Sequence, residues 1–287
     1  TPGSTARSVT LARQGEGWRI ESPISFPADA TKIQDAWWEL QSAEAEAFEV
    51  DRPGEADLAR FGLSRPRLSL TVEPKDGPGP IRIDFSREEP SGPVHARRSG
   101  REAVMRVGGK ILETLEAMAA GVDDLRDARV APVDRFRLAR VAVRQPGAAA
   151  PAAPDDLLLF KDEESRWHRG AEDGAELPSE EVNALLDAIL DMKGDSFVDN
   201  PRIDSSSGSV LNVELTERGE EARSVSVTIG PDRGEATRGV TSSTTSSVYR
   251  VPAAAVGTLL ERVAALRSAK ETPAAADGGS DEPDDTP

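Results

Sequence analysis

The sequence contains no cysteine, and this absence removes several kinds of site at once. Without thiolates the chain cannot form disulfides, zinc–thiolate sites, iron–sulfur clusters or a cysteine nucleophile. Histidine is scarce as well, since only His95 and His168 occur, and neither has His-x-x-x-His or Glu-x-x-His spacing. A helical zinc site is therefore excluded, and we expect both histidines to be solvated at the surface.

Basic residues are in deficit, with 35 Lys and Arg against 51 Asp and Glu and a net charge of −16. This charge argues against binding to nucleic acid or to an anionic membrane surface, because both require a basic patch. No run of 18 apolar residues is present, so no segment of this sequence is predicted to span a bilayer. Because the chain begins with Thr1 rather than Met, we expect it to be part of a longer polypeptide with a leader or anchor upstream.

Sequence motifs of catalysis are missing too. There is no Gly-x-Ser-x-Gly elbow and no calcium loop, and the glycines of segment 106–109 lack the Lys-Ser/Thr pair of a phosphate-binding loop. Carboxylates are abundant, but no spacing selects one catalytic pair. We predict no catalytic residue, no cofactor and no metal ligand, and therefore no enzyme. An enzyme that uses unpaired carboxylates is the last of three hypotheses.

The chain does contain an internal repeat. An offset of 149 residues aligns Trp18 with Trp167 without a gap, and further along the offset becomes 144. The first offset pairs Leu11 with Phe160, Ile33 with Val182, Trp37 with Leu186, Leu40 with Ile189 and Phe48 with Phe197. The second pairs Ile83 with Val227, Phe85 with Ile229, Val107 with Val251 and Leu115 with Leu259. We infer a duplicated module whose second copy lacks a short piece of one loop.

Each copy is predicted to form a hairpin, a helix, further strands and a closing helix. Period-two alternation around Trp18 and around Trp167 predicts the hairpins. Apolar residues at helical spacing predict helices after Asp29 and Pro178, and again at the end of each copy. Hairpins separated by helices are typical of the α+β class. The predicted fold is therefore α+β, with two tandem, structurally similar modules, each a mainly antiparallel sheet covered by two helices.

Composition divides the chain further. The predicted segments are a flexible N-terminus (1–8), a first module (9–145), an Ala/Pro-rich linker (146–156), a second module (157–267) and an acidic disordered tail (268–287). The first module includes a strand at 139–143. By the offset of 149, the counterpart of this strand in the first copy would lie ahead of Thr1, which is a second reason to expect more chain upstream.

Aromatic residues make up only 4% of the chain, so their positions are informative. Trp18 and Trp167 occupy equivalent positions and are predicted core anchors. Trp37 falls on the apolar helix stripe, whereas Trp38 lies about 100° further round the helix. The counterpart of Trp38 in the second copy is Asp187, which indicates a solvated position. Trp38 is therefore the candidate partner-contact residue, with packing against a neighbouring loop as the alternative.

Four short segments, taken in order, resemble an uncharacterised bacterial family called domain of unknown function 4340. They are Trp18-Arg-Ile-Glu-Ser-Pro23, Ala28-Asp29, Phe61-Gly-Leu-Ser-Arg-Pro66 and Leu125-Arg-Asp127 ahead of a strand. The resemblance covers residues 9–145 well and the second copy more weakly. It implies an extracytoplasmic protein held at the inner membrane by an N-terminal helix that this chain lacks. It also implies association with gliding-motility-type ABC transporters and a larger auxiliary membrane protein. The family has no known catalytic residues to carry over.

Two functions follow as expectations. The first is a non-enzymatic, periplasmic accessory subunit that binds the membrane subunits of an ABC-type transporter or its larger auxiliary protein. The alternative is a carrier that holds a lipid or glycan fragment at a site between the two modules. Neither involves nucleic acid or a cofactor.

Overall fold

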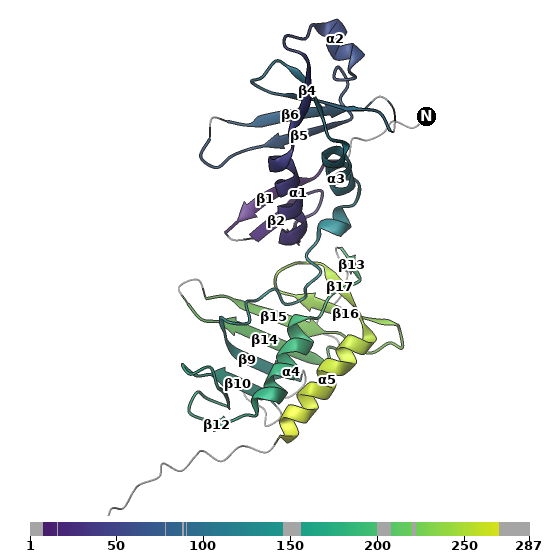
Figure 1. Ribbon diagram of the computed structural model, residues 1–287. Helices are drawn as coiled ribbons and strands as arrows, with labels where there is room; N and C mark the ends of the chain where they lie inside the picture. The colour runs from purple at the N-terminus through teal and green to yellow at the C-terminus, as the bar shows by residue number, and fades with distance from the viewer. Residues whose placement is uncertain are drawn as a thin grey trace, which may run out of the picture. The chain divides into compact units, whose positions relative to one another are not determined.

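The computed structural model describes residues 8–15, 17–77, 79–87, 89, 91–145, 156–199, 208–219 and 222–269. The chain divides into two compact units, unit 1 up to Asp127 and unit 2 from Ala128 (Figure 1). Both contain antiparallel sheets and helices, so the predicted α+β class is confirmed. Apart from a few residues at their borders, the predicted flexible N-terminus, linker and acidic tail lie outside the described residues.

Unit 1 contains two antiparallel sheets. Its elements are β1 (Thr10–Gln14), β2 (Gly17–Ser22), β3 (Phe26–Ala28), α1 (Ala30–Ser42), β4 (Ala45–Val50), α2 (Glu55–Arg60), β5 (Leu68–Val72), β6 (Ile81–Ser86), β7 (Val94–Arg98), β8 (Val104–Val107), α3 (Gly109–Ala120) and the 3-10 helix η1 (Val122–Leu125). The smaller sheet has the order β1-β2-β3 and the larger one β4-β8-β7-β6-β5. Side chains of the larger sheet and of α3 form one core cluster, which contains Phe85, Val94, Ala96, Ile111 and Leu112.

Helix α1 begins where the sequence predicts. The Asp29 carboxylate accepts hydrogen bonds from the backbone N–H groups of Thr31 (3.0 Å) and Lys32 (3.4 Å), which caps the first turn. The buried side of the helix is centred on Ile33 and Ala36. Trp37, predicted to be buried, is 36% exposed, because it lies 100° round from Ala36 at the margin of that stripe.

Unit 2 contains one nine-stranded sheet. Its elements are β9 (Leu138–Arg144), β10 (Leu157–Lys161), β11 (Trp167–Arg169), β12 (Ala175–Glu176), α4 (Ser179–Leu190), β13 (Ser196–Val198), β14 (Leu211–Glu217), β15 (Ser224–Ile229), β16 (Thr237–Ser242), β17 (Val248–Pro252) and α5 (Ala253–Ser268). The strand order is β12-β11-β10-β9-β14-β15-β16-β17-β13. Helices α4 and α5 lie side by side on one face of this sheet (Figure 1).

The two helices of unit 2 bury the apolar stripes that their sequences predict. The buried residues are Val182, Leu185, Leu186 and Ile189 in α4, and Val256, Leu259, Val263 and Leu266 in α5. Their spacing of three and four residues places them on one side of each helix. Among the described residues, no helix is both long and apolar enough to span a membrane.

The predicted boundary between the modules was wrong at strand β9. The sequence prediction placed this strand in the first module (9–145), but the structure places it in the sheet of unit 2, between β10 and β14. Val143 pairs with Leu157 on one side and with Val213 on the other. Val141 and Val143 are buried there, so the strand contributes its apolar face to the core of unit 2. The division of the chain accordingly falls after Asp127.

Apart from β9, the two units pair their strands in the same order. The order β4-β8-β7-β6-β5 of unit 1 corresponds to β13-β17-β16-β15-β14 of unit 2, and β1-β2-β3 corresponds to β10-β11-β12. The registers correspond as well, at the offsets of 149 and 144 found in the sequence. The corresponding pairs are Arg19↔Pro27 with His168↔Glu176, Phe48↔Met105 with Phe197↔Tyr249, and Ile83↔Arg98 with Val227↔Ser242.

In two hairpins of unit 2, the connection between the paired residues is one residue longer than in the corresponding hairpin of unit 1. In the first, Arg13 pairs with Trp18 as Lys161 pairs with Trp167, so Leu11 corresponds to Leu159. The predicted alignment of Leu11 with Phe160 was therefore wrong by one position, because the turn after β10 is one residue longer. In the second, Leu70 pairs with Ile83 as Val213 pairs with Val227. Strand β5 therefore corresponds to β14 residue by residue.

Candidate interaction surfaces

Trp38, the candidate contact residue, lies on the exposed side of α1. Its side chain is 68% exposed, in agreement with its predicted position outside the apolar stripe. The opposite side of α1 is held by Ile33 and Ala36, and Glu39 forms an ion pair of 2.6 Å with Lys110 at the start of α3. The helix is therefore anchored on one side while a large aromatic ring faces solvent on the other. That Trp38 contacts a partner remains a prediction.

The corresponding position in unit 2 is used differently. Asp187 on α4 stands where α1 carries Trp38, and its carboxylate forms an ion pair with Arg135. The same guanidinium donates a hydrogen bond of 3.0 Å to the side-chain oxygen of Asn183. In unit 2 this part of the helix thus carries a charge that is paired with an arginine of the same unit, whereas in unit 1 it presents an apolar ring.

Two further aromatic rings are exposed. Phe48 on β4 is 63% exposed, although its counterpart Phe197 is half-buried and packs edge-on against Tyr249 at 5.5 Å. Phe136, ahead of β9, is 88% exposed. Isolated exposed apolar side chains are common, so these rings alone do not define a site. Unit 1 nevertheless presents exposed aromatic rings on two consecutive elements, α1 and β4.

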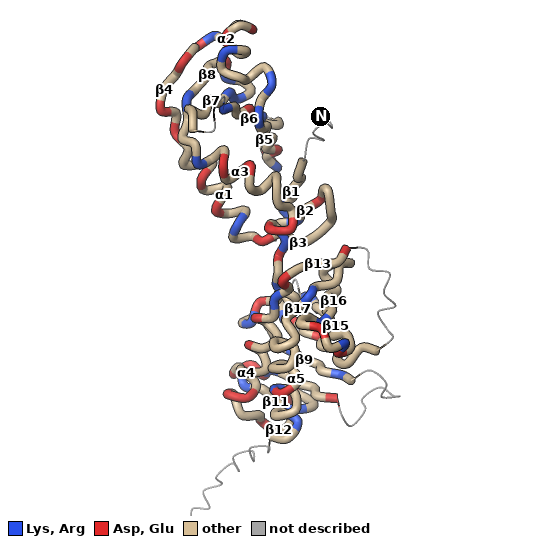
Figure 2. The backbone as a smooth tube through the Cα atoms, turned by 90° about the vertical axis from the view of Figure 1, so that its right-hand side faces the viewer, with Lys and Arg blue, Asp and Glu red and all other residues tan. Residues whose placement is uncertain are grey.

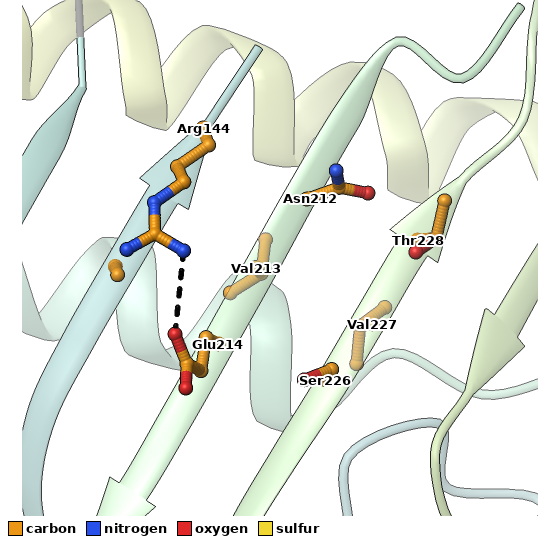
Figure 3. Close-up of a pocket in the computed structure, with 8 residues that line it drawn as sticks. Arg144, Asn212, Val213, Glu214, Ser226, Val227 and Thr228 are labelled. Carbon is orange, nitrogen blue, oxygen red and sulfur yellow. Dashed lines mark ion pairs between the residues drawn. The ribbon is translucent and has the colours of Figure 1, made fainter. Parts of the chain in front are cut away.

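The face of the unit 2 sheet opposite its helices contains an open hollow of about 260 Å³ (Figure 3). Its lining residues come from β9, β14 and β15 and are Ala142, Arg144, Asn212, Val213, Glu214, Ser226, Val227 and Thr228. Figure 3 shows Arg144 turned toward Glu214, at 3.5 Å between Nη1 and Oε2. The side-chain oxygen of Asn212 is buried and has no hydrogen-bond partner among the residues that the structure describes. Ligand pockets usually exceed about 300 Å³ and are mainly apolar, so this hollow is smaller and more polar than a typical ligand pocket.

His168 is a buried titratable side chain, and its geometry points to a structural role. Its Nε2 lies 2.9 Å from Asp162 Oδ2 and its Nδ1 lies 3.0 Å from the carbonyl oxygen of Gly174. Both neighbours accept hydrogen bonds, so the doubly protonated ring satisfies both, and the hydrogen bond to Asp162 raises the pKa of His168. With both nitrogens engaged, the ring has none left to take a proton from a substrate.

The carboxylate of Asp162 is held in its charged form. Burial by itself would raise its pKa, but hydrogen bonds from His168 and from the backbone and side chain of Arg166 outweigh this effect and lower the pKa to about 2. The Asp162–His168 pair thereby ties β10 to β11 across the hairpin turn. Within the described part of the chain, no group of three or more acidic or histidine side chains is placed to hold a metal ion.

The predicted exposure of both histidines was wrong. His168 is buried because strand β11 carries it directly after Trp167, under the turn that contains Asp162. His95 is buried in β7, with its ring 4.7 Å from that of Phe61. The run Val94–Ala96 is buried throughout, as in a strand with both faces covered.

Three of the four segments that carry the family resemblance have structural roles. Phe61 and Leu63 are buried in one small cluster after α2, and Gly62 between them adopts φ +69°, which favours glycine. The backbone N–H of Asp29 donates to the carbonyl of Leu125 at 2.8 Å, and that of Asp127 donates to Pro27 at 2.9 Å. The last motif therefore fastens the end of unit 1 to β3.

Within that motif, Arg126 is a buried cation. Its side chain is only 2% exposed, its Nε lies 2.9 Å from Asp123 Oδ1, and its guanidinium lies 4.9 Å from the ring centroid of Phe26. A buried guanidinium that pairs with a carboxylate and an aromatic face fixes local geometry. Sequence reasoning recognised the motif but not this burial, since arginine is usually a surface residue.

In the comparison with known families, the model of domain of unknown function 4340 (DUF4340) matches residues 18–209. This range includes the four segments that carry the resemblance. This match spans more than half of the chain. The chain belongs to the DUF4340 family. The matched region begins at Trp18 in unit 1 and extends past the division at Asp127 into unit 2. No curated protein and no solved structure matches the chain.

Proposed function

We propose that this protein is a non-enzymatic accessory subunit of an ABC-type transport complex of the gliding-motility type. In this proposal it lies outside the cytoplasm, is held at the inner membrane, and binds the membrane subunits of the complex. The observation that carries the proposal is the 68% exposed side chain of Trp38 on a helix whose other side is fixed in the core. The transport setting rests on the family resemblance.

An exposed tryptophan is suited to this role. Tryptophan is enriched among the few interface residues that dominate binding energy, because it buries a large apolar area at low entropic cost. At the equivalent place unit 2 carries Asp187, which is already paired with Arg135. The contrast favours unit 1, through α1, as the part of the chain that binds a partner.

We propose a protein that is not an enzyme because its buried charged side chains bind other groups of the same chain. His168 and Asp162 bind each other and the hairpin backbone. Arg126 is buried against Phe26 and Asp123. Acidic and basic residues occur along both units rather than gathering on one of them (Figure 2).

The test is site-specific photo-crosslinking of the membrane-bound, full-length protein in its native host, with a photoreactive amino acid at position 38. We expect a crosslink to a membrane subunit of an ABC transporter. Trp38→Ala should weaken capture of that subunit about thirtyfold, which corresponds to about 2 kcal/mol for a dominant interface residue.

Phe136→Ala is the matched control, since Phe136 is even more exposed but lies in unit 2. It should leave the capture unchanged. Equal capture by the Trp38→Ala variant and the unaltered protein would show that α1 does not form the interface.

A further inference from the structure

Each of the two sheets of unit 1 ends on a strand with an open edge. In the described part of the chain, β1 pairs only with β2, and β5 pairs only with β6. An outer strand presents backbone N–H and C=O groups that can pair with another strand. Unit 1 therefore has such an edge at β1 in the smaller sheet and at β5 in the larger one; the other outer strands are β3 and β4.

In unit 2 a single strand occupies both corresponding edges. The counterparts of β1 and β5 are β10 and β14, and β9 pairs antiparallel with both. Val141 of β9 faces Leu159 on one side and Leu215 on the other. This one strand joins a three-stranded and a five-stranded group into a nine-stranded sheet.

The side chains along these edges are buried to different degrees in the two units. Leu159, Val213 and Leu215, which pair with β9 in unit 2, and Leu211 at the start of β14 are fully buried. Their counterparts in unit 1 are Leu11, Leu68, Leu70 and Val72, and all four are only half-buried. The residue types in the two sets are nearly identical. We therefore attribute the difference in burial to the strand β9, which is present beside one set only.

We propose that unit 1 binds an extended polypeptide segment between β1 and β5, in antiparallel pairing with both strands. The occupant has small apolar side chains at every second position, as β9 has Val141 and Val143. These side chains cover the half-buried leucines, while the backbone of the segment satisfies the two open edges. Unit 1 then has the same nine-stranded sheet as unit 2.

This binding site is independent of the Trp38 surface. It depends on β1 and β5, whereas the proposed transporter contact depends on α1. Either proposal can fail without the other. The strand site predicts recognition by backbone pairing and an alternating apolar pattern, so charge on the outward-facing side of the segment is not required.

The first experiment measures amide hydrogen exchange in the full chain with a synthetic peptide that has the sequence of residues 137–145, which contain β9. At a peptide concentration ten times its Kd, exchange in residues 10–14 and 68–72 should slow by about tenfold. Exchange in residues 157–161 and 211–217 should not change, because β9 already occupies those edges. The same peptide with Val141→Asp and Val143→Asp is the control and should protect neither unit.

The second experiment supplies the strand within the chain. Residues 138–156, which comprise β9 and its connection to β10, are placed directly ahead of Val9, so the high effective concentration removes any limit from weak affinity. The tethered strand should protect β1 and β5 as the peptide does. If neither the peptide nor the tethered strand slows exchange there, or if both units are slowed alike, the proposal is wrong.

Discussion

Unit 1 and unit 2 pair their strands in the same order, yet their sheets are closed to different degrees. In unit 2, β9 completes a continuous sheet, and the apolar residues paired with it on one face, Leu157, Leu159, Val213 and Leu215, are buried. In unit 1 the described strands form two sheets, and Leu68 and Leu70 at the open edge are half-buried. Even the equivalent tryptophans differ, since Trp167 is buried and Trp18 is half-buried. Strand β9 accounts for the difference in sheet closure.

The largest expected effect comes from a charge in the centre of β9. Val143→Asp would bury an unpaired carboxylate between Leu157 and Val213, which costs roughly 4 kcal/mol or more and should unfold unit 2. Unit 1 should stay folded, because β9 pairs with none of its strands. Hydrogen exchange resolved by segment would check this, with Arg144→Gln as the control on the outward side of the same strand.

This variant also tests the division of the chain. If Val143→Asp destabilised unit 1 as much as unit 2, the assignment of β9 to unit 2 would be wrong.

A smaller and graded effect is expected for equivalent leucines. Leu211→Ala should cost about 3 kcal/mol, because it leaves a cavity in a fully buried site. Leu68→Ala, at the corresponding position of unit 1, should cost about half as much, because its side chain is already partly in water. Urea unfolding of each unit, followed by segment-resolved exchange, gives the two values. Similar costs would mean that both edges are equally covered.

The smallest effect concerns the pH dependence of unit 2. Folding raises the pKa of His168 above its unfolded value of 6.5, so its stabilising contribution is complete below pH 6.5 and is lost as pH rises through the folded pKa. The contribution of Asp162 is present above pH 3.8 and is lost as pH falls toward its folded pKa of about 2. The counterpart of His168 in unit 1 is Arg19, so unit 1 has no histidine at this position.

His168→Gln should therefore lower the Tm of unit 2 at pH 5.5 and make little difference at high pH. A Tm difference that is the same at pH 5.5 and at pH 9 would contradict a charged Asp162–His168 pair.

Local patterns predicted much of the fold correctly. The helix stripes of α4 and α5, the cap at Asp29 and the hairpins followed from residue spacing, because each depends on neighbours a few positions away. The offsets of 149 and 144 also reappear in the strand registers. Alternation correctly predicted β9 as a strand but could not show which sheet it joins, since strand pairing is a tertiary property.

The candidate site was less predictable. Exposure of Trp38 followed from helix geometry, but the burial of His95, His168 and Arg126 did not, because each depends on a partner brought close by folding. Trp37 was misjudged because it lies at the margin of the stripe, where a large ring extends beyond the cover of its neighbours.

Amide hydrogen exchange of the unmodified full chain, with no added peptide, tests the central comparison most directly. We predict that residues 10–14 and 68–72 exchange much faster than the equivalent residues 157–161 and 211–217, because only the latter are paired on both sides. Equal protection of the two sets would contradict the view that unit 1 is the open form of the sheet that β9 closes in unit 2.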